Sequence, residues 1–384
     1  MTTAFCPFIQ FEEILLSCPL VQTPAFILMK HSLLALLLLI TCPLYVAAET
    51  RHTGEIGGSG FIVDVPDEAT GDVLFLARGY RPDTLPLSAV YEKETAFFQT
   101  LRKEGWTIAS PSFQGNRWVM ADGAADIIAL RAHVDAEIIK IKRAFLYGES
   151  MGGGIIGWLA EQAPEGFDGA IALGAYLYQE PKGETPPNPK PADYLPGKPG
   201  FPIILLTNNV EAEIAGSRDY AKRAAGSTLA PVLWTVNRSG HVNLNSAERL
   251  KALRAVIDWS DTRKAPSPMD ATIVMDPVSV AAIHANTAAA RITRTRPLYG
   301  NIYTSFVAGD LSRLDITLGD TFNLTHGKQT VNATFATTYN GVPLGEWVAF
   351  IDPEGRVQIS RNYANATATF GALKGDVLLI SATE

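Results

Sequence analysis

A serine between two glycines is the feature of this sequence that most directly suggests chemistry. The segment from Gly148 to Gly152 reads Gly-Glu-Ser-Met-Gly, a pattern that places a nucleophilic serine on a sharp turn between a strand and a helix. The apolar run 143–147 predicts the strand, and the glycines at 152–154 predict where the helix begins. The amino end of such a helix favours negative charge that develops beside it. The motif therefore predicts Ser150 as a nucleophile.

A serine hydroxyl is a weak nucleophile unless a base takes its proton. The chain has six histidines, and His241 is the one that lies between Ser150 and residue 270. It follows a strand predicted at 231–236 and precedes a helix predicted at 246–259, where a base is expected when the chain order is serine, acid, histidine. We therefore expect His241 to be the general base.

The acid that orients this base is expected after the strand predicted at 203–206. Three carboxylates follow that strand, namely Glu211, Glu213 and Asp219. The spacing from the end of the strand favours Glu211, with Glu213 as the alternative acid, because Asp219 is expected on the next helix. A carboxylate here would hold the imidazole tautomer and stabilise the imidazolium.

An oxyanion needs two backbone N–H donors. We expect one from Met151, directly after the nucleophile, and the other from Tyr80 in the loop after the strand predicted at 73–77. The Arg78 side chain in the same loop is expected to favour anionic substrates. Trp118, in a later loop, is expected to line a cleft.

Alternating elements surround these residues over 55–262. Apolar runs of this kind predict strands buried on both faces of a parallel sheet, at 73–77, 106–110, 143–147, 168–173, 202–206 and 231–236. Periodic segments predict helices at 92–104, 122–141, 155–163 and 246–259. This alternation predicts an α/β fold with a mostly parallel sheet. The proline-rich segment 178–202 breaks the pattern and predicts a long loop.

The pattern of residue types in the sequence changes after residue 262. We expect a linker and a short helix over 263–297 and a small β-barrel domain over 298–384. Short β-like runs punctuated by Gly, Asn and Asp support this expectation, at 315–318, 330–338, 346–351, 356–360 and 377–380.

Composition narrows the range of functions. The 384 residues carry 32 Lys and Arg against 39 Asp and Glu, a net charge of −7, and the length predicts two globular domains. Mild acidity argues against nucleic acid as a partner, since such binding needs a basic face. Cys6, Cys18 and Cys42 all lie near the start, and the histidines are scattered, so we expect no metal and no other cofactor.

Residues 1–48 are expected to be a leader that contains a signal peptide. An apolar run at 33–40 follows Met29 and a lysine, and small residues end at Ala48. We expect translation to start at Met29 and cleavage to occur near Ala48; a lipoprotein signal ending at Cys42 and an uncleaved anchor are the alternatives. The apolar run is short for a membrane span. The mature chain is therefore expected to be secreted or periplasmic, without a stable membrane span.

Residues 55–262 resemble the α/β-hydrolase superfamily, in its branch of compact secreted esterases and peptidase-like proteins. The resemblance rests on the motif around Ser150 and on the stretch 105–122. It implies a catalytic triad of Ser150, Glu211 and His241. In two places this chain differs: an arginine stands where the oxyanion loop usually has histidine, and the acid is Glu where Asp is commoner.

Residues 298–381 resemble the C-terminal β-barrel domain of the S-adenosylmethionine hydroxide adenosyltransferases. The matching pieces occur in the same order in both, at 299–304, 318–320, 337–339, 345–346, 351–359, 362–366 and 374–377. In that family the domain contacts adenine, which implies ligand contacts at Asn301 and within 351–365, including Arg356. The family's own N-terminal domain is absent, so we expect a barrel repurposed for substrate binding or for contact between copies. The resemblance implies a trimer as the oligomer.

Together these observations predict an exported serine hydrolase. Its substrate is expected to be a small-molecule carboxylic ester, or less readily an amide, cleaved through an acyl-enzyme on Ser150. The alternative is a non-catalytic exported protein whose C-terminal barrel binds a nucleoside or another ligand. The sequence defines neither the acyl nor the alcohol part of the substrate.

Overall fold

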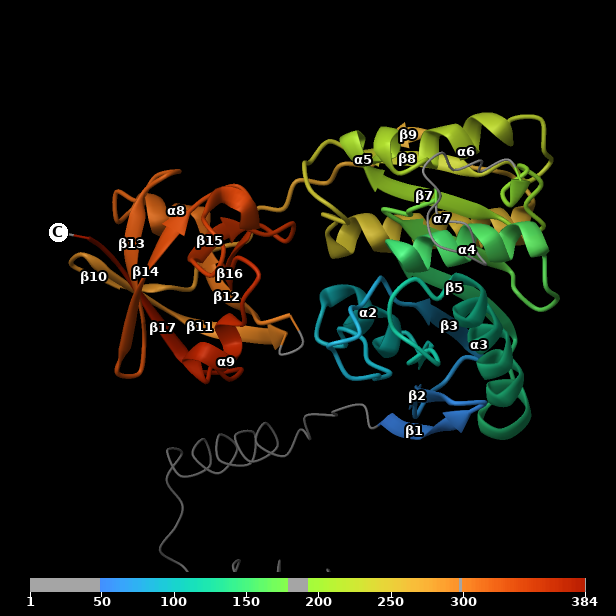
Figure 1. Cartoon of the computed structure of the whole chain (residues 1–384), viewed down its shortest axis with the longest axis horizontal. Helices are drawn as coiled ribbons and strands as arrows, with labels where there is room; N and C mark the ends of the chain where they lie inside the picture. The colour runs from blue at the N-terminus through green and yellow to red at the C-terminus, as the bar shows by residue number, and fades with distance from the viewer. Residues whose placement is uncertain (1–48, 179–192, 297–298, 384) are drawn as a thin grey trace, which may run out of the picture. The chain divides into compact units, whose positions relative to one another are not determined.

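The computed structural model of the protein describes residues 49–178, 193–296 and 299–383 (Figure 1). The predicted leader, with its three cysteines, and most of the predicted proline-rich loop lie outside these residues. No helix in the described part of the chain is long and apolar enough to cross a membrane.

A nine-stranded sheet organises the first part of the chain. Its strand order is β1-β2-β4-β3-β5-β6-β7-β8-β9; β1 and β2 are antiparallel to their neighbours, and all pairs from β4 to β9 are parallel. The strands are β1 (Glu49–Ile56), β2 (Ser59–Pro66), β3 (Asp72–Ala77), β4 (Thr107–Pro111), β5 (Arg143–Glu149), β6 (Gly169–Leu173), β7 (Ile203–Asn208), β8 (Val232–Val236) and β9 (Met269–Asp270).

Helices cover both faces of this sheet (Figure 1). They are α2 (Ala96–Lys103), α3 (Met120–His133), α4 (Met151–Gln162), α5 (Asn209–Ile214), α6 (Ser217–Arg223) and α7 (Ser246–Thr262), with a π-helical turn η1 (Val134–Ile138) after α3. Side chains of β3 alternate between two cores: Val73 and Phe75 pack with α3 and α4, whereas Leu74 packs with α2 and α7. This double burial is why the central strands read as continuous apolar runs.

A second, eight-stranded sheet forms the C-terminal part. Its order is β10-β11-β12-β16-β15-β14-β13-β17, and β17 also pairs with β11, which closes a barrel. The strands are β10 (Ala282–His284), β11 (Thr287–Arg296), β12 (Asn301–Val307), β13 (Thr321–His326), β14 (Gln329–Phe335), β15 (Trp347–Ile351), β16 (Arg356–Arg361) and β17 (Val377–Ala382). Three short helical segments accompany them, α8 (Ala308–Ser312), η3 (Tyr339–Gly341) and α9 (Ala366–Phe370). The α/β fold followed by a small β-barrel is therefore confirmed.

Two predictions about the C-terminal part were wrong. The described residues 264–296 contain strands but no helix, and β11 belongs to the barrel, with Ala288, Ala290 and Ile292 buried in its core. Buried and less buried side chains alternate along the first part of β11, as expected for a strand, but the small alanines made this alternation hard to see in the sequence. The run 315–318 forms turns instead of a strand, because Asp315 has a φ of 56° and the Asp320 carboxylate caps the segment.

Hydrogen exchange distinguishes β11 from a linker. We expect the amides of 288–292 to exchange slowly, since β11 pairs with strands on both sides, whereas those of 274–280, which form no helix or strand, exchange fast. Exchange of intact protein followed by mass spectrometry measures both segments in one experiment. Equally fast exchange of the two would show that 263–297 is a linker throughout.

Candidate active site

Ser150 occupies a strained turn between β5 and α4. Its backbone has φ 57° and ψ −118°, a conformation that costs free energy for a residue with a side chain and that concentrates at functional sites. Three backbone hydrogen bonds hold the turn: the Ser150 N–H donates to Leu173 O (2.9 Å), and Ser150 O accepts from Gly154 N and Tyr176 N (both 3.1 Å). Helix α4 begins at the next residue, so its amino end adjoins the serine.

Glycines on both sides of the serine allow three backbones to meet. A Cβ at Gly148 would lie 2.3 Å from Gly152 O, and one at Gly152 would lie 1.9 Å from Ala77 O at the end of β3. No side-chain adjustment relieves contacts of this kind, since the obstructing atoms belong to the main chain. The glycines of the motif are therefore required by packing.

Replacement of Gly152 tests this packing. We expect Gly152→Ala to lower the free energy of unfolding by about 1–3 kcal/mol or to prevent folding, because the added methyl group overlaps backbone. Gly226→Ala is the matched control, since nothing lies within 4 Å of its Cβ position. Thermal and urea unfolding measure both variants, and equal stability would contradict the packing argument.

The predicted oxyanion donors belong to residues near Ser150: Met151 follows it, and Tyr80 follows Gly79. A Cβ at Gly79 would be 3.5 Å from the Ser150 Cβ and 3.4 Å from Glu149 O, so the loop after β3 runs directly past Ser150. Among the hydrogen bonds of the described residues, neither the Tyr80 nor the Met151 N–H donates to a protein acceptor. Two N–H groups near one serine are what an oxyanion requires.

The structure joins His241 to Glu211. His241 Nδ1 hydrogen-bonds to Glu211 Oε1, and Glu211 Oε2 accepts from Thr207 Oγ1 (3.1 Å) and Val242 N (3.4 Å). Glu211 is buried at the start of α5, whereas the His241 side chain is 60% exposed. The hydrogen bond to Glu211 raises the pKa of His241, and so does the negative charge of Glu149.

Shared neighbours place this pair at the same edge of the sheet as the serine. Glu211 lies against Gly174. Gly174 directly follows Leu173, the last residue of β6, whose carbonyl oxygen accepts a hydrogen bond from Ser150 N. The hydrogen bonds of the described residues do not include one between Ser150 Oγ and His241. In substrate-free enzymes, the hydrogen bonds between catalytic groups are often long or poorly aligned and tighten when substrate binds.

The loop that carries His241 is tied down by polar side chains. Asn208 accepts from Asn243 N (2.9 Å) and donates to Asn243 O (3.1 Å), and Arg238 also donates to Asn243 O (2.7 Å). Arg238 in turn pairs with Glu248, whose carboxylate completes a capping box with Asn245 at the start of α7. The histidine loop is thus anchored to β7 and to α7.

Glu213, the alternative acid, points elsewhere. It pairs with Arg218 Nε at 2.5 Å and is exposed, and Asp219 on α6 accepts from Tyr178 OH. Residues two apart on a helix face opposite sides, so Glu211 and Glu213 cannot both reach the histidine. The structure therefore brings Glu211, and not Glu213, against His241.

Arg78 does not offer its charge to a substrate. Its guanidinium donates to Ser112 O (2.9 Å) and Gly115 O (2.6 Å) and lies over the Phe113 ring, so its donors are used within the protein. Burial lowers the pKa of Arg78 to about 10. The expected preference for anionic substrates is not supported by this arrangement.

Sequence reasoning missed an ion pair at the residue before Ser150. Glu149, the residue before Ser150, is bonded to Arg249 of α7, and both contact Tyr147 OH. Burial opposes the charge of Glu149, yet the positive charge of Arg249 and the Tyr147 hydrogen bond lower its pKa overall. The signal available in the sequence for this ion pair was Glu149, the acidic residue in the second position of the Gly-Glu-Ser-Met-Gly motif.

The two barrel residues predicted to contact a ligand lie apart. Asn301 is buried in a polar network, where it donates to Tyr339 OH (3.0 Å) and accepts from Ser360 Oγ (3.1 Å). Arg356 donates to Ser305 O near the other end of the same strands. The structure does not bring these two side chains together.

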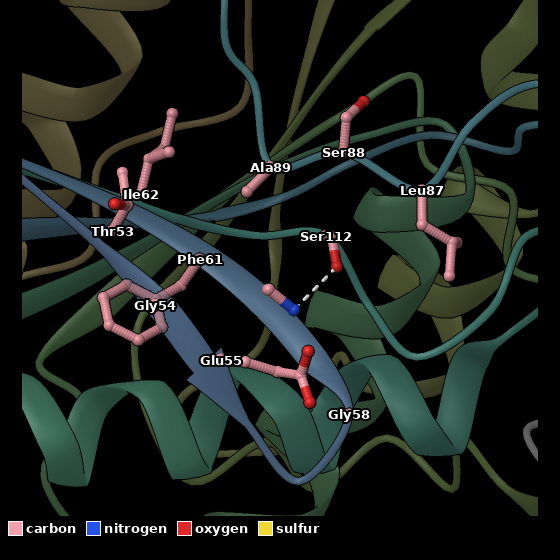
Figure 2. Close-up of a pocket in the computed structure, with 11 residues that line it drawn as sticks. Thr53, Gly54, Glu55, Gly58, Phe61, Ile62, Leu87, Ser88, Ala89 and Ser112 are labelled. Atoms are coloured by element: carbon pink, nitrogen blue, oxygen red, sulfur yellow. Dashed lines mark hydrogen bonds between the residues drawn. The ribbon is translucent and has the colours of Figure 1, made fainter.

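One hollow in the described residues is separate from Ser150 (Figure 2). It encloses about 370 Å³ against the β1–β2 hairpin and includes Ser112 and Leu87. The Ser112 hydroxyl accepts from Gly60 N (3.0 Å) and donates to Phe113 O (2.7 Å), so it has no base. In the described chain, no group of three or more His, Cys, Asp or Glu side chains could hold a metal ion.

The described topology defines the first part of the chain as an α/β-hydrolase fold, with the serine turn after β5. Residues 298–379 match the family described as the SAM hydroxide adenosyltransferase C-terminal domain, which confirms the resemblance of the barrel. No curated protein matches the chain.

Several solved structures match over parts of the chain. An esterase from Pyrococcus furiosus is 14% identical, with 57% of this chain and 92% of that chain covered and a TM-score of 0.41. An S-formylglutathione hydrolase from Staphylococcus aureus is 14% identical, with 56% and 96% covered and a TM-score of 0.39. An uncharacterized conserved protein from Thermotoga maritima is 18% identical over 29% of this chain and 40% of its own length, with a TM-score of 0.26. Such distant likenesses say nothing about the reaction of this chain.

The pKa of His241 tests its coupling to Glu211. Its raised pKa depends on the Glu211 hydrogen bond and charge, so Glu211→Gln is expected to lower it, and the imidazole then loses its proton at a lower pH than in the wild type. Titration of the imidazole signal by NMR measures the shift without any substrate. Glu213→Gln is the matched control and is expected to leave the midpoint unchanged. Equal midpoints in wild type and Glu211→Gln would contradict the assignment.

Proposed function

We propose that the protein is a serine hydrolase that cleaves a small-molecule carboxylic ester through an acyl-enzyme on Ser150. The observation that carries the proposal is the strained backbone of Ser150 on a strand–helix turn, with a His–Glu pair at the same edge of the sheet. Strain of this kind persists where the surrounding structure enforces it, and the close passage of Gly79 beside the serine side chain supports the proposal.

The reaction follows from the roles of these groups. His241 takes the proton of Ser150 Oγ, which attacks the carbonyl carbon of the ester. The N–H groups of Met151 and Tyr80 stabilise the oxyanion, and the protonated His241 then gives its proton to the departing alcohol. Water, deprotonated by His241, releases the acid and restores the serine. Glu211 orients the imidazole and stabilises its charged form throughout.

Mutation of the triad tests the proposal. We expect Ser150→Ala and His241→Ala to lower kcat/KM for 4-nitrophenyl acetate and butyrate by about 10⁴-fold or more, and Glu211→Gln by about 10²- to 10⁴-fold. Ser150→Ala should also abolish covalent labelling by a fluorophosphonate. Glu213→Gln is the control and is expected to keep wild-type rates. A folded wild-type protein that neither turns over these esters nor becomes labelled would refute the proposal.

A second candidate function is ligand binding by the barrel. It is favoured by the family match at 298–379 and by the buried polar network of Asn301, Tyr339 and Ser360. In that case adenosine would raise the melting temperature of the wild type, and Asn301→Ala would remove the effect.

We also propose, from the sequence pattern of residues 1–48 and from the resemblance of the barrel, that the protein is exported and that it forms trimers.

A further inference from the structure

Four aromatic rings from three loops form a row at the edge of the sheet where Ser150 lies, beyond the carboxyl ends of the parallel strands. Tyr80 follows β3, Trp118 precedes α3, and Tyr176 and Tyr178 follow β6. Their ring centroids are 5.5 Å apart for Tyr80 and Trp118, 5.2 Å for Trp118 and Tyr176, and 6.4 Å for Tyr176 and Tyr178. We call these four side chains the aromatic row.

The aromatic row begins beside the nucleophile. Tyr80 follows Gly79, whose Cβ position lies 3.5 Å from the Ser150 Cβ. Tyr176 donates its N–H to Ser150 O at 3.1 Å. Two members of the row are therefore attached, through the main chain, to the immediate surroundings of Ser150.

Much of the row remains exposed. Tyr80 is 41% exposed and Trp118 37% exposed, and Tyr176 and Tyr178 are partly buried. None of the four belongs to the hydrophobic cores of the domain. Large aromatic side chains that stay exposed in a contiguous group mark binding sites more often than scattered surface residues do.

Two arginines hold the loops of Tyr80 and Trp118 together. Arg78, two residues before Tyr80, donates to Gly115 O and to Asn116 Oδ1 (3.2 Å). On the other side of Tyr80, Arg81 O accepts from Arg117 N at 2.7 Å. Each ring is thus flanked by contacts that tie its loop to the other loop, so the spacing of the two rings is set before any ligand arrives.

Hydrogen bonds to a side chain of α3 also restrain the loop that carries Trp118. The buried Asp126 of α3 accepts from Gln114 N (3.0 Å) and Gln114 Nε2 (2.8 Å). Arg117, next to Trp118, has a φ of 64°, a backbone conformation that persists only where neighbouring contacts enforce it. A rigid aromatic surface binds with little loss of conformational freedom.

We propose that the aromatic row is the subsite for a flat aromatic ring carried by the ester, in its acyl or its alcohol part. The inference rests on the proposed function of Ser150 and names the substrate class of that site. A flat ring stacks against Trp118 and its neighbours, whereas a saturated ring of similar size and hydrophobicity does not. The Arg78 guanidinium nearby is already engaged by Ser112 O, Gly115 O and Asn116 Oδ1, so we expect stacking to be the main source of selectivity.

Matched ester pairs test the subsite in the full-length protein. Benzyl acetate against cyclohexylmethyl acetate places the ring in the alcohol part, and methyl phenylacetate against methyl cyclohexylacetate places it in the acyl part. We expect kcat/KM, measured by pH-stat, to favour the aromatic member of one pair by about ten-fold, on the scale of one good aromatic contact. The pair that shows the preference identifies which part of the ester carries the ring.

Variants at Trp118 then assign the preference to the aromatic row. Trp118→Leu is expected to reduce the ratio to about one to two, and Trp118→Phe to keep most of it. Leu87→Ala is the control, since Leu87 is exposed in the hollow of Figure 2 and lies outside the row. A ratio of one in the wild type, or a ratio that changes in Leu87→Ala but not in Trp118→Leu, overturns the subsite.

A binding measurement separates this inference from the proposed reaction. In Ser150→Ala, ligand-detected NMR is expected to show tighter binding of the aromatic ester than of its saturated partner, and Trp118→Leu in the same background is expected to remove the difference. Ring-dependent binding in a wild type without turnover or fluorophosphonate labelling would support the aromatic row and refute the hydrolase. Equal binding of both esters would overturn the aromatic row, whether or not esters are cleaved.

Discussion

The conformation of the Ser150 backbone is the constraint on which the rest of the site depends. A serine with φ 57° is stable here because glycines let β5, the first turn of α4 and the end of β3 approach through main-chain atoms alone. That approach directs the amino end of α4 at the serine, brings the loop after β3 past its side chain and leaves the Met151 and Tyr80 N–H groups beside it. Without this close packing, neither Ser150 nor the Met151 and Tyr80 N–H groups would have a defined position.

Around this turn the site is assembled by polar contacts between loops more than by apolar packing. Glu211 holds His241, the Arg238–Glu248 pair holds the histidine loop, and Arg78 holds the loop that carries Trp118. Loops lack the periodic hydrogen bonds of helices and strands, so their side chains must satisfy main-chain groups instead. Arg78 in the loop after β3, unexpected from the resemblance, has this structural role.

The local pattern allowed much of the fold to be predicted. Continuous apolar runs identified the central strands because both faces of the sheet are covered, and the motif identified Ser150 because a strained turn requires glycines in nearby positions. β11 was missed because alanine favours helices and its small side chains weaken the alternation of a strand. A strand was wrongly predicted at 315–318 because Ile316 and Thr317 favour strands, whereas an aspartate after them caps a turn.

The sequence by itself determined the order of most elements and the strand–helix turn at Ser150, because each depends on residues close together in the chain. Only the tertiary structure decided which of two glutamates meets His241, where the Arg78 donors go and which rings stand beside Ser150. These contacts join the segments after β3, β4, β5, β6, β7 and β8, which come together because of the strand order in the sheet. That order depends on pairing between distant segments, and no local pattern of residue types encodes which side chains then touch.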